Sequence, residues 1–171
     1  VNNVAVGCEF SGLNGTLGSN TTGGSNVAMG DDALGANTTA SDNTAFGTLA
    51  LRTNSTGTQN TAVGSGSLDA NTTANSSTAI GYLSLSGNTT GAANTAVGHR
   101  ALLLNSTAQF NVAVGQAALE TNTTGANCTG VGRAALVGNT SGANNTAVGN
   151  DALGANTTGA GNTSIGQGAL A

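Results

Sequence analysis

The sequence predicts an all-β protein, a parallel β-solenoid of the β-roll or β-helix kind, built from about ten 17-residue coils. A glycine recurs with a strict 17-residue period from Gly30 to Gly166, and one apolar residue such as Val97 precedes each of these glycines. A fixed period of this length is typical of a solenoid that adds one coil per repeat. The chain has no proline, which fits coils that hydrogen-bond to the coils above and below them.

The repeat unit reads Asn-Thr-Ala-Val-Gly-x-x-Ala-Leu-x-x-Asn-Thr-Thr-Gly-x-x. Its glycines and its Asn-Thr-Thr segment disfavour helix. We expect Thr-Ala-Val-Gly and x-Ala-Leu to form two short strands per coil, joined by turns. The apolar residue before the glycine and the leucine are then expected to fill a thin core. The leucine column comprises Leu34, Leu51, Leu68, Leu85, Leu102, Leu119, Leu136, Leu153 and Leu170.

The first repeat interval, from Gly7 to Gly30, is longer than the others by a six-residue insertion. Residues 1–25 are therefore expected to form an N-terminal lead-in or capping coil that contains this insertion, since terminal repeats usually need a cap. Residues 26–171 are expected to form the tandem repeats of one solenoid domain. At the usual strand spacing of ~4.8 Å, ten coils make a rod about 50 Å long.

A slim rod of this kind buries little apolar surface in each coil, so neighbouring chains would stabilise it. We expect a homo-oligomer, and an alanine column offers a smooth face that another chain can approach closely. This column comprises Ala28, Ala45, Ala62, Ala79, Ala96, Ala113 and Ala147.

Composition argues against several classes of protein. Only 6% of the residues are charged, with three arginines, no lysine and a net charge of −4. Nucleic acids and anionic membranes require clustered basic side chains, so neither is expected as a partner. No stretch approaches the ~20 apolar residues of a membrane-spanning helix, so direct membrane insertion is not expected. A single histidine and no nucleophile–base pair indicate neither an enzyme nor a cofactor site.

The two cysteines, Cys8 and Cys128, lie about seven coils apart in the sequence. That separation is roughly 30 Å along the rod, against about 6 Å between the Cα atoms of a disulfide. They are not expected to pair within one chain. Cys128 stands in a column of asparagines, and a small buried thiol is favoured there over an intermolecular link.

A second asparagine column is the best candidate for a modified or structural corner. Each of its members is followed two residues later by Thr or Ser, the acceptor pattern for N-glycosylation. A stacked polar corner, with amides and hydroxyls bonded from coil to coil, is the favoured interpretation, and a glycan carrier is the alternative. The column comprises Asn20, Asn37, Asn54, Asn71, Asn88, Asn105, Asn122, Asn139 and Asn156.

Charged and aromatic residues fall in the variable positions around Ala-Leu. The first interpretation of these positions is a solvated face, and the functional alternative is a contact surface for a receptor or a surface glycan. The candidate contact residues are Asp31, Arg52, Tyr82, His99, Arg100, Arg133 and Asp151.

The segments Asn94–Gly98 and Ser77–Gly81 carry a Ser/Asn-x-Ala-Ile/Val-Gly signature. In this signature the chain resembles the head repeats of trimeric autotransporter adhesins, and also repeat arrays of bacterial surface proteins and phage-type fibres. The resemblance implies a left-handed parallel β-roll, a trimer, and a place outside the cell or on a cell or virion surface. The coils here are longer than those of the adhesin heads.

Together these observations predict a non-catalytic structural fibre, or the shaft or head of an adhesin, that associates with copies of itself. One alternative is a glycan-coated extracellular fibril whose units stack end to end. A second alternative is an ice-binding solenoid, which needs a regular threonine array on one side. The threonines are expected in the Asn-Thr-Thr corner and not in a strand, which disfavours this alternative.

Overall fold

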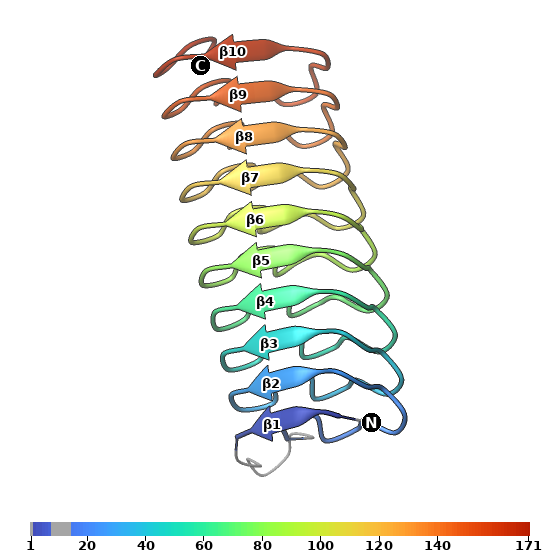
Figure 1. Ribbon diagram of the computed structural model, residues 1–171. Coiled ribbons are helices and arrows are strands. Elements are labelled where there is room, and N and C mark those ends of the chain that lie inside the picture. Colours follow the sequence, from blue (N-terminus) through green and yellow to red (C-terminus); the bar gives the residue numbers. More distant parts are fainter. Residues whose placement is uncertain (1, 8–14) are drawn as a thin grey trace.

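A computed structural model describes residues 2–7 and 15–171, and its described part is a parallel β-solenoid with one ten-stranded sheet (Figure 1). The strands pair in sequence order, β1 with β2 and so on to β10, always in parallel. Cys8 and most of the insertion of the first coil lie outside the described residues. The strands are β1 Val4–Val6, β2 Val27–Met29, β3 Thr44–Phe46, β4 Thr61–Val63, β5 Thr78–Ile80, β6 Thr95–Val97, β7 Val112–Val114, β8 Thr129–Val131, β9 Thr146–Val148 and β10 Thr163–Ile165.

The register confirms the 17-residue coil. Ala62 of β4 lies beside Ala79 of β5, and every later strand pair repeats this 17-residue offset. In Figure 1 the strands all run to the left at the front, and the chain returns to the right behind them. Successive coils stack upward, from the N-terminal end at the bottom to the C-terminal end at the top. This winding is left-handed.

Each described coil contains one strand, so the expectation of two strands per coil was wrong. The Ala-Leu segment lies in a turn, and its leucines have a left-handed backbone with φ near 50°, for example 52° at Leu102. This conformation costs a residue with a side chain roughly 1–2 kcal/mol. Burial of the leucine side chain, worth roughly 1.5–3 kcal/mol, offsets that cost. The local conformational preference of leucine does not indicate that burial of its side chain offsets the cost of a left-handed backbone.

The glycine after each strand is required by the close stacking of the coils. Gly98 has φ 135°, and a Cβ atom on it would lie 2.5 Å from the carbonyl oxygen of Gly115 in the next coil. Both the backbone conformation and the contact exclude a side chain. The same contact recurs from Gly30 to Gly149. Glycine therefore recurs every 17 residues because at this position the backbone of one coil packs directly on the backbone of the next.

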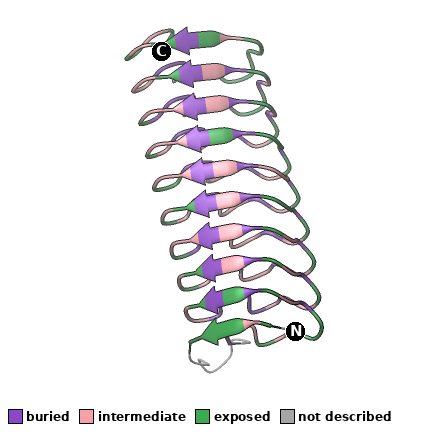
Figure 2. Cartoon of the chain, viewed as in Figure 1, coloured by how far each residue is buried: buried purple, intermediate pink, exposed green. Residues whose placement is uncertain are grey.

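The core consists of the alanine and leucine columns. Leu102 and Ala96 have no exposed surface, and Figure 2 shows the buried central residue of β2 to β10 as a band along the rod. The structure places eight of the nine predicted core leucines inside, from Leu34 to Leu153, while Leu170 of the last coil is 68% exposed.

An asparagine column just before the strands joins consecutive coils from within. Asn43 Oδ1 accepts a hydrogen bond from the backbone N–H of Asn60 at 2.9 Å, and Asn43 Nδ2 donates to the carbonyl oxygen of Gly57 at 2.9 Å. This side chain therefore satisfies two backbone groups of the following coil, and Asn26 and Asn60 do the same. Asn111 accepts the N–H of Cys128 in this way, but its buried Nδ2 has no partner among the described residues. We call this the inner asparagine ladder; its described members are Asn3, Asn26, Asn43, Asn60, Asn94, Asn111, Asn145 and Asn162, with Ser77 and Cys128 standing in two coils.

Cys128 is fully buried and has a free thiol. Its Sγ takes the place of the amide nitrogen and lies 3.1 Å from the carbonyl oxygen of Gly142. Burial raises the pKa of the Cys128 thiol, although the backbone N–H groups of Asn145 and Asn144 counteract this. A protonated buried thiol is a poor nucleophile, so Cys128 is a structural residue.

Candidate functional site

The outer face of the sheet is the most distinctive surface of the molecule. Successive residues of a strand point to opposite faces, and in β6 the central Ala96 is buried while Thr95 and Val97 lie outside. The same pattern holds in β3, where Ala45 is buried between Thr44 and Phe46. The Thr-Ala-Val segment therefore turns its smallest side chain inward.

This orientation corrects two expectations from the sequence. The apolar residue before each glycine was expected in the core, and it lies on the outer face. The alanine column was expected to meet another chain, and all of its seven members have no exposed surface. The cross-section of each coil is filled by one leucine and two alanines, so the valine is left outside. The sequence does not give the dimensions of the closed coil, and the orientation of the valine depends on them.

The outer face carries two columns of side chains. The first column is mostly threonine, as in Thr61 and Thr78, and is half-buried in the middle of the rod. The second column is apolar throughout and retains much exposed surface: 37% at Met29, 51% at Phe46 and 40% at Ile80. No charged residue occurs in the ten strands that the structure describes. Since parallel pairing is in register, the two columns form a continuous apolar and hydroxyl stripe along the sheet. We call this stripe the outer sheet face.

The second asparagine column, predicted as a polar corner or a glycan carrier, lies inside the rod. Asn37, Asn54, Asn71, Asn88, Asn105, Asn122 and Asn139 have no exposed surface. Asn105 Nδ2 donates to Asn88 Oδ1 at 2.8 Å and to the carbonyl oxygen of Ala108 at 3.0 Å. Asn20 and Asn156, at the two ends of the column, are partly exposed. In the folded coils the nitrogen that would accept a glycan is therefore engaged in a buried ladder, which we call the corner asparagine ladder.

The predicted contact residues do not converge on one site. They form separate pairs between neighbouring coils, on the turn after each strand. Arg52 Nε lies 3.0 Å from Asp69 Oδ1, and Tyr82 stacks on His99 with ring centroids 5.6 Å apart. Burial raises the pKa of Asp69, and Arg52 counteracts this shift.

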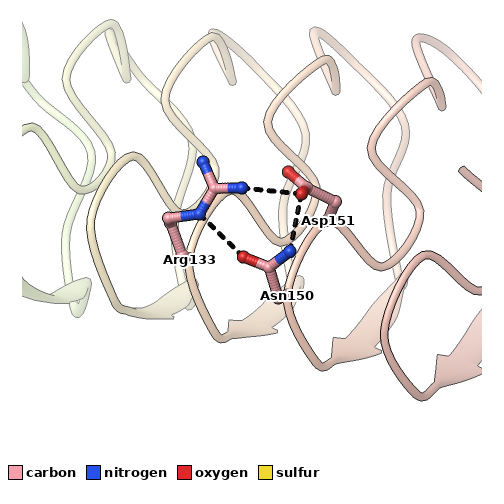
Figure 3. Close-up of polar contacts among 3 residues, drawn as sticks. All are labelled: Arg133, Asn150 and Asp151. Atoms are coloured by element: carbon pink, nitrogen blue, oxygen red, sulfur yellow. Dashed lines mark hydrogen bonds and ion pairs between the residues drawn. The ribbon is translucent and has the colours of Figure 1, made fainter.

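Two further pairs complete this surface. Arg100 forms an ion pair with Glu120. Arg133 donates to Asn150 Oδ1 at 2.7 Å and to Asp151 Oδ2 at 2.8 Å, as Figure 3 shows. Asp31, the remaining candidate, is half-buried in the turn after β2. The paired side chains contact one another along the rod and do not gather around a common ligand position.

No cavity is found in the part of the chain that the structure describes. The described residues contain no cluster of three or more metal-ligating side chains. No helix of the described chain is long and apolar enough to cross a membrane. The described residues present three kinds of surface: an apolar outer sheet face, a polar turn surface and exposed corners.

None of the protein-family models, curated proteins or solved structures compared with this chain matches it.

Proposed function

We propose that the chain is a non-catalytic structural fibre protein, a rigid β-solenoid that associates with copies of itself along the outer sheet face. The observation that carries this proposal is the apolar column of that face. It runs from Val6 to Ile165 with no charged residue, while charged side chains occupy the turns. A continuous apolar surface of this length is typical of an interaction site.

The energetics favour a long contact over a local one. Full burial of a valine or leucine side chain contributes roughly 1.5–3 kcal/mol. The outer apolar residues range from partly buried, as at Val63 and Val97, to 51% exposed at Phe46, so covering what remains contributes up to about 1 kcal/mol per coil. Association costs about 4–15 kcal/mol. Nine coils together reach that range, whereas two or three do not. Self-association then depends on the rod as a whole.

A second copy is the occupant that fits best. Two outer sheet faces with the same coil spacing can place their apolar columns against each other over the full length, which few unrelated partners would match. The resemblance to adhesin heads supports a trimer and a place outside the cell or on a cell or virion surface. The paired residues of the turn surface, including Tyr82 and Arg133, remain outside this contact and are available to a receptor or a surface glycan.

The molecular mass of the particle in solution tests the proposal. The chain is expected to sediment and scatter as a multiple of its 16.2 kDa. The double variant Val97→Lys/Val114→Lys is expected to shift the particle to the mass of one chain, because two adjacent charges enter the apolar column. The matched control Gln109→Lys/Gln116→Lys adds the same charges at exposed positions outside the sheet and is expected to leave the mass unchanged. A single-chain particle for the native protein would refute self-association.

The position of the threonines favours a second candidate function, ice binding. The sequence placed the regular threonines in a corner, but a threonine column also lies on the outer sheet face, including Thr61, Thr78 and Thr95. Hydroxyl and methyl groups repeat there at the strand spacing of ~4.8 Å, an array that can order water. Thermal hysteresis of a monodisperse solution measures this activity. Its presence, with loss in Thr78→Lys/Thr95→Lys, would favour ice over a second chain as the occupant of this face.

A further inference from the structure

The second residue after the asparagine of each Asn-Thr-Thr corner is exposed, although it carries a hydroxyl group in every coil. It is threonine in eight coils and serine in one, and its side-chain oxygen makes no hydrogen bond among the described residues. We call these residues the corner hydroxyl column: Thr22, Thr39, Thr56, Thr73, Thr90, Thr107, Thr124, Ser141 and Thr158.

The preceding residue in each corner has a clear structural role, and the contrast is informative. Thr89 Oγ1 donates to the carbonyl oxygen of Ser106 in the next coil at 3.0 Å, and Thr140 Oγ1 donates to that of Thr157 at 3.0 Å. That hydroxyl closes a ladder between coils, so its repetition needs no further explanation. Thr90 and Ser141 have no equivalent bond.

Exposure alone does not require a hydroxyl. The position three residues further along each coil is also mostly exposed, yet it varies freely from coil to coil. Its residues are Ser25, Asp42, Gln59, Ser76, Ala93, Phe110, Asn127, Asn144 and Gly161. The repeats have thus diverged in side chain at this mostly exposed position, even though its backbone is left-handed in every coil. β-branching does not explain the corner column either, because Val would serve equally and Ser141 lacks the branch.

The N-glycosylation pattern requires a hydroxyl at this position, but its acceptor asparagine is unsuitable in the folded coil. Asn88 Nδ2, for example, is buried and donates to Asn71 Oδ1 at 3.3 Å and to the carbonyl oxygen of Gly91 at 3.0 Å. A glycan on this nitrogen would break the corner asparagine ladder. The accessible group in each corner is the hydroxyl of the corner hydroxyl column.

We propose that the corner hydroxyl column is a site of O-linked glycosylation, with one short neutral glycan on each modified corner. A transferase takes the proton from the Thr Oγ1, which attacks the anomeric carbon of a nucleotide-activated sugar. The new C–O bond replaces the bond from the anomeric carbon to phosphate, and the nucleoside diphosphate leaves with the electron pair. The reaction needs only an exposed hydroxyl, and the folded rod presents one in every corner.

The spacing of the column selects a neutral group over phosphate. Neighbouring coils are separated by ~4.8 Å, and each phosphate would carry about −1.5 to −2 charges. Such charges would repel strongly along the column, and the chain has three arginines and no lysine to compensate them. Arg52, Arg100 and Arg133 are already paired with carboxylates elsewhere on the rod. A short uncharged sugar avoids this repulsion.

The proposal is independent of self-association, because it concerns the corners and not the outer sheet face. Its test uses the chain from its native source, digested and analysed by mass spectrometry with fragmentation that retains side-chain modifications. Hexose-type mass is expected on residues such as Thr39, Thr73 and Thr90, and on neither Thr38 nor Thr89. Unmodified corner hydroxyls would overturn the proposal. Mass found on Asn37 or Asn88, released by an amidase specific for Asn-linked glycans, would overturn it as well.

Three variants made in the native source separate modification from folding. Thr90→Val is expected to lose the mass of one glycan and to melt at the native temperature. Thr90→Ser retains a hydroxyl and is expected to keep the glycan. The matched control Thr89→Val removes the bond to Ser106, and it is expected to lower the melting temperature and leave the number of glycans unchanged. If Thr90→Val instead melts like Thr89→Val and loses no mass, the corner hydroxyl column is structural.

Discussion

The interior and the outer sheet face of this rod differ in the polarity of their side chains. The interior contains more polar side chains than is usual for a β core. Away from the two ends of the rod, the asparagines of the inner and corner ladders are fully buried beside leucine and alanine. On the outer sheet face, valine, isoleucine and phenylalanine remain exposed. The ordinary arrangement of polar outside and apolar inside is thus partly reversed.

Backbone hydrogen bonding explains this reversal. A solenoid coil has turns whose N–H and C=O groups face inward, and an unpaired buried backbone group costs about 1–3 kcal/mol. Asparagine supplies a donor and an acceptor to such groups, as Asn43 does for Asn60 and Gly57. The outer face does not have to satisfy buried backbone groups of the turns, so its side chains are available for an external contact. The interior is thus specified by hydrogen bonding as well as by apolar packing, whereas the outer face carries apolar side chains that the single chain leaves uncovered.

The largest expected effect is that of a charge placed inside the rod. Leu102→Asp puts an uncompensated carboxylate into the core and removes a buried side chain, a change that costs at least about 4 kcal/mol. We expect no folded chain by circular dichroism. Leu104→Asp is the matched control in the same coil, since Leu104 is 50% exposed, and it is expected to fold and melt normally. A folded Leu102→Asp variant would show that the leucine column is not the core.

Next in size is the loss of one amide from the corner asparagine ladder. Asn88→Ala removes two donated bonds and leaves Asn105 Nδ2 without the acceptor that lies at 2.8 Å. At about 1 kcal/mol for each lost partner, we expect the free energy of unfolding to fall by about 3 kcal/mol.

The control for this change is Gln116→Ala, at an exposed position, which is expected to shift the free energy of unfolding by less than about 0.5 kcal/mol. Urea denaturation measures both variants. Equal effects would mean that the buried amides contribute no more than exposed ones, and the distinction between interior and exterior would fail.

Much of the interior could be predicted from the sequence because the stacked coils require the same residue type at the same position in every repeat. The period, the parallel sheet and the leucine column follow from residues that recur without exception, such as Gly98 and Leu102. The favoured interpretation of the corner asparagines as a coil-to-coil ladder agrees with their burial and bonds. These features depend on contacts between equivalent residues of neighbouring coils, and a repeated sequence shows which residues are equivalent.

The faces of the strand could not be predicted in the same way. Thr95, Ala96 and Val97 alternate, but the alternation does not say whether alanine or valine points inward. That depends on the cross-section of the closed coil. The left-handed backbone of Leu102 also depends on the whole coil, because its local preference opposes it. For this reason two strands per coil were expected, and the outer sheet face was not recognised.

A smaller effect is expected where the inner asparagine ladder is interrupted. The sulfur of Cys128 is a weak acceptor and donor compared with a carboxamide. Cys128→Asn places the residue found in neighbouring coils at this position, with an acceptor for the N–H of Asn145 and a donor toward the carbonyl oxygen of Gly142. We expect the free energy of unfolding to rise by about 1 kcal/mol, measured by urea denaturation under reducing conditions. A decrease would show that the coil around Cys128 is adapted to the smaller side chain. Cys128→Ala, which fits but cannot bond, is the control and is expected to be less stable than the native chain.

The smallest expected effect belongs to the charged turn surface. Arg100 is paired with Glu120, but its side chain is 45% exposed, so water and salt screen the pair. Arg100→Ala is expected to change the free energy of unfolding by no more than about 0.5 kcal/mol. Its left-handed backbone, with φ 59°, is shared by alanines at the same position of other coils, such as Ala117 and Ala134, so the substitution adds no backbone strain. A loss well above that value, which persists in high salt, would mean that the turn surface helps to hold the coils together. It would then belong with the interior and be less available as a contact surface.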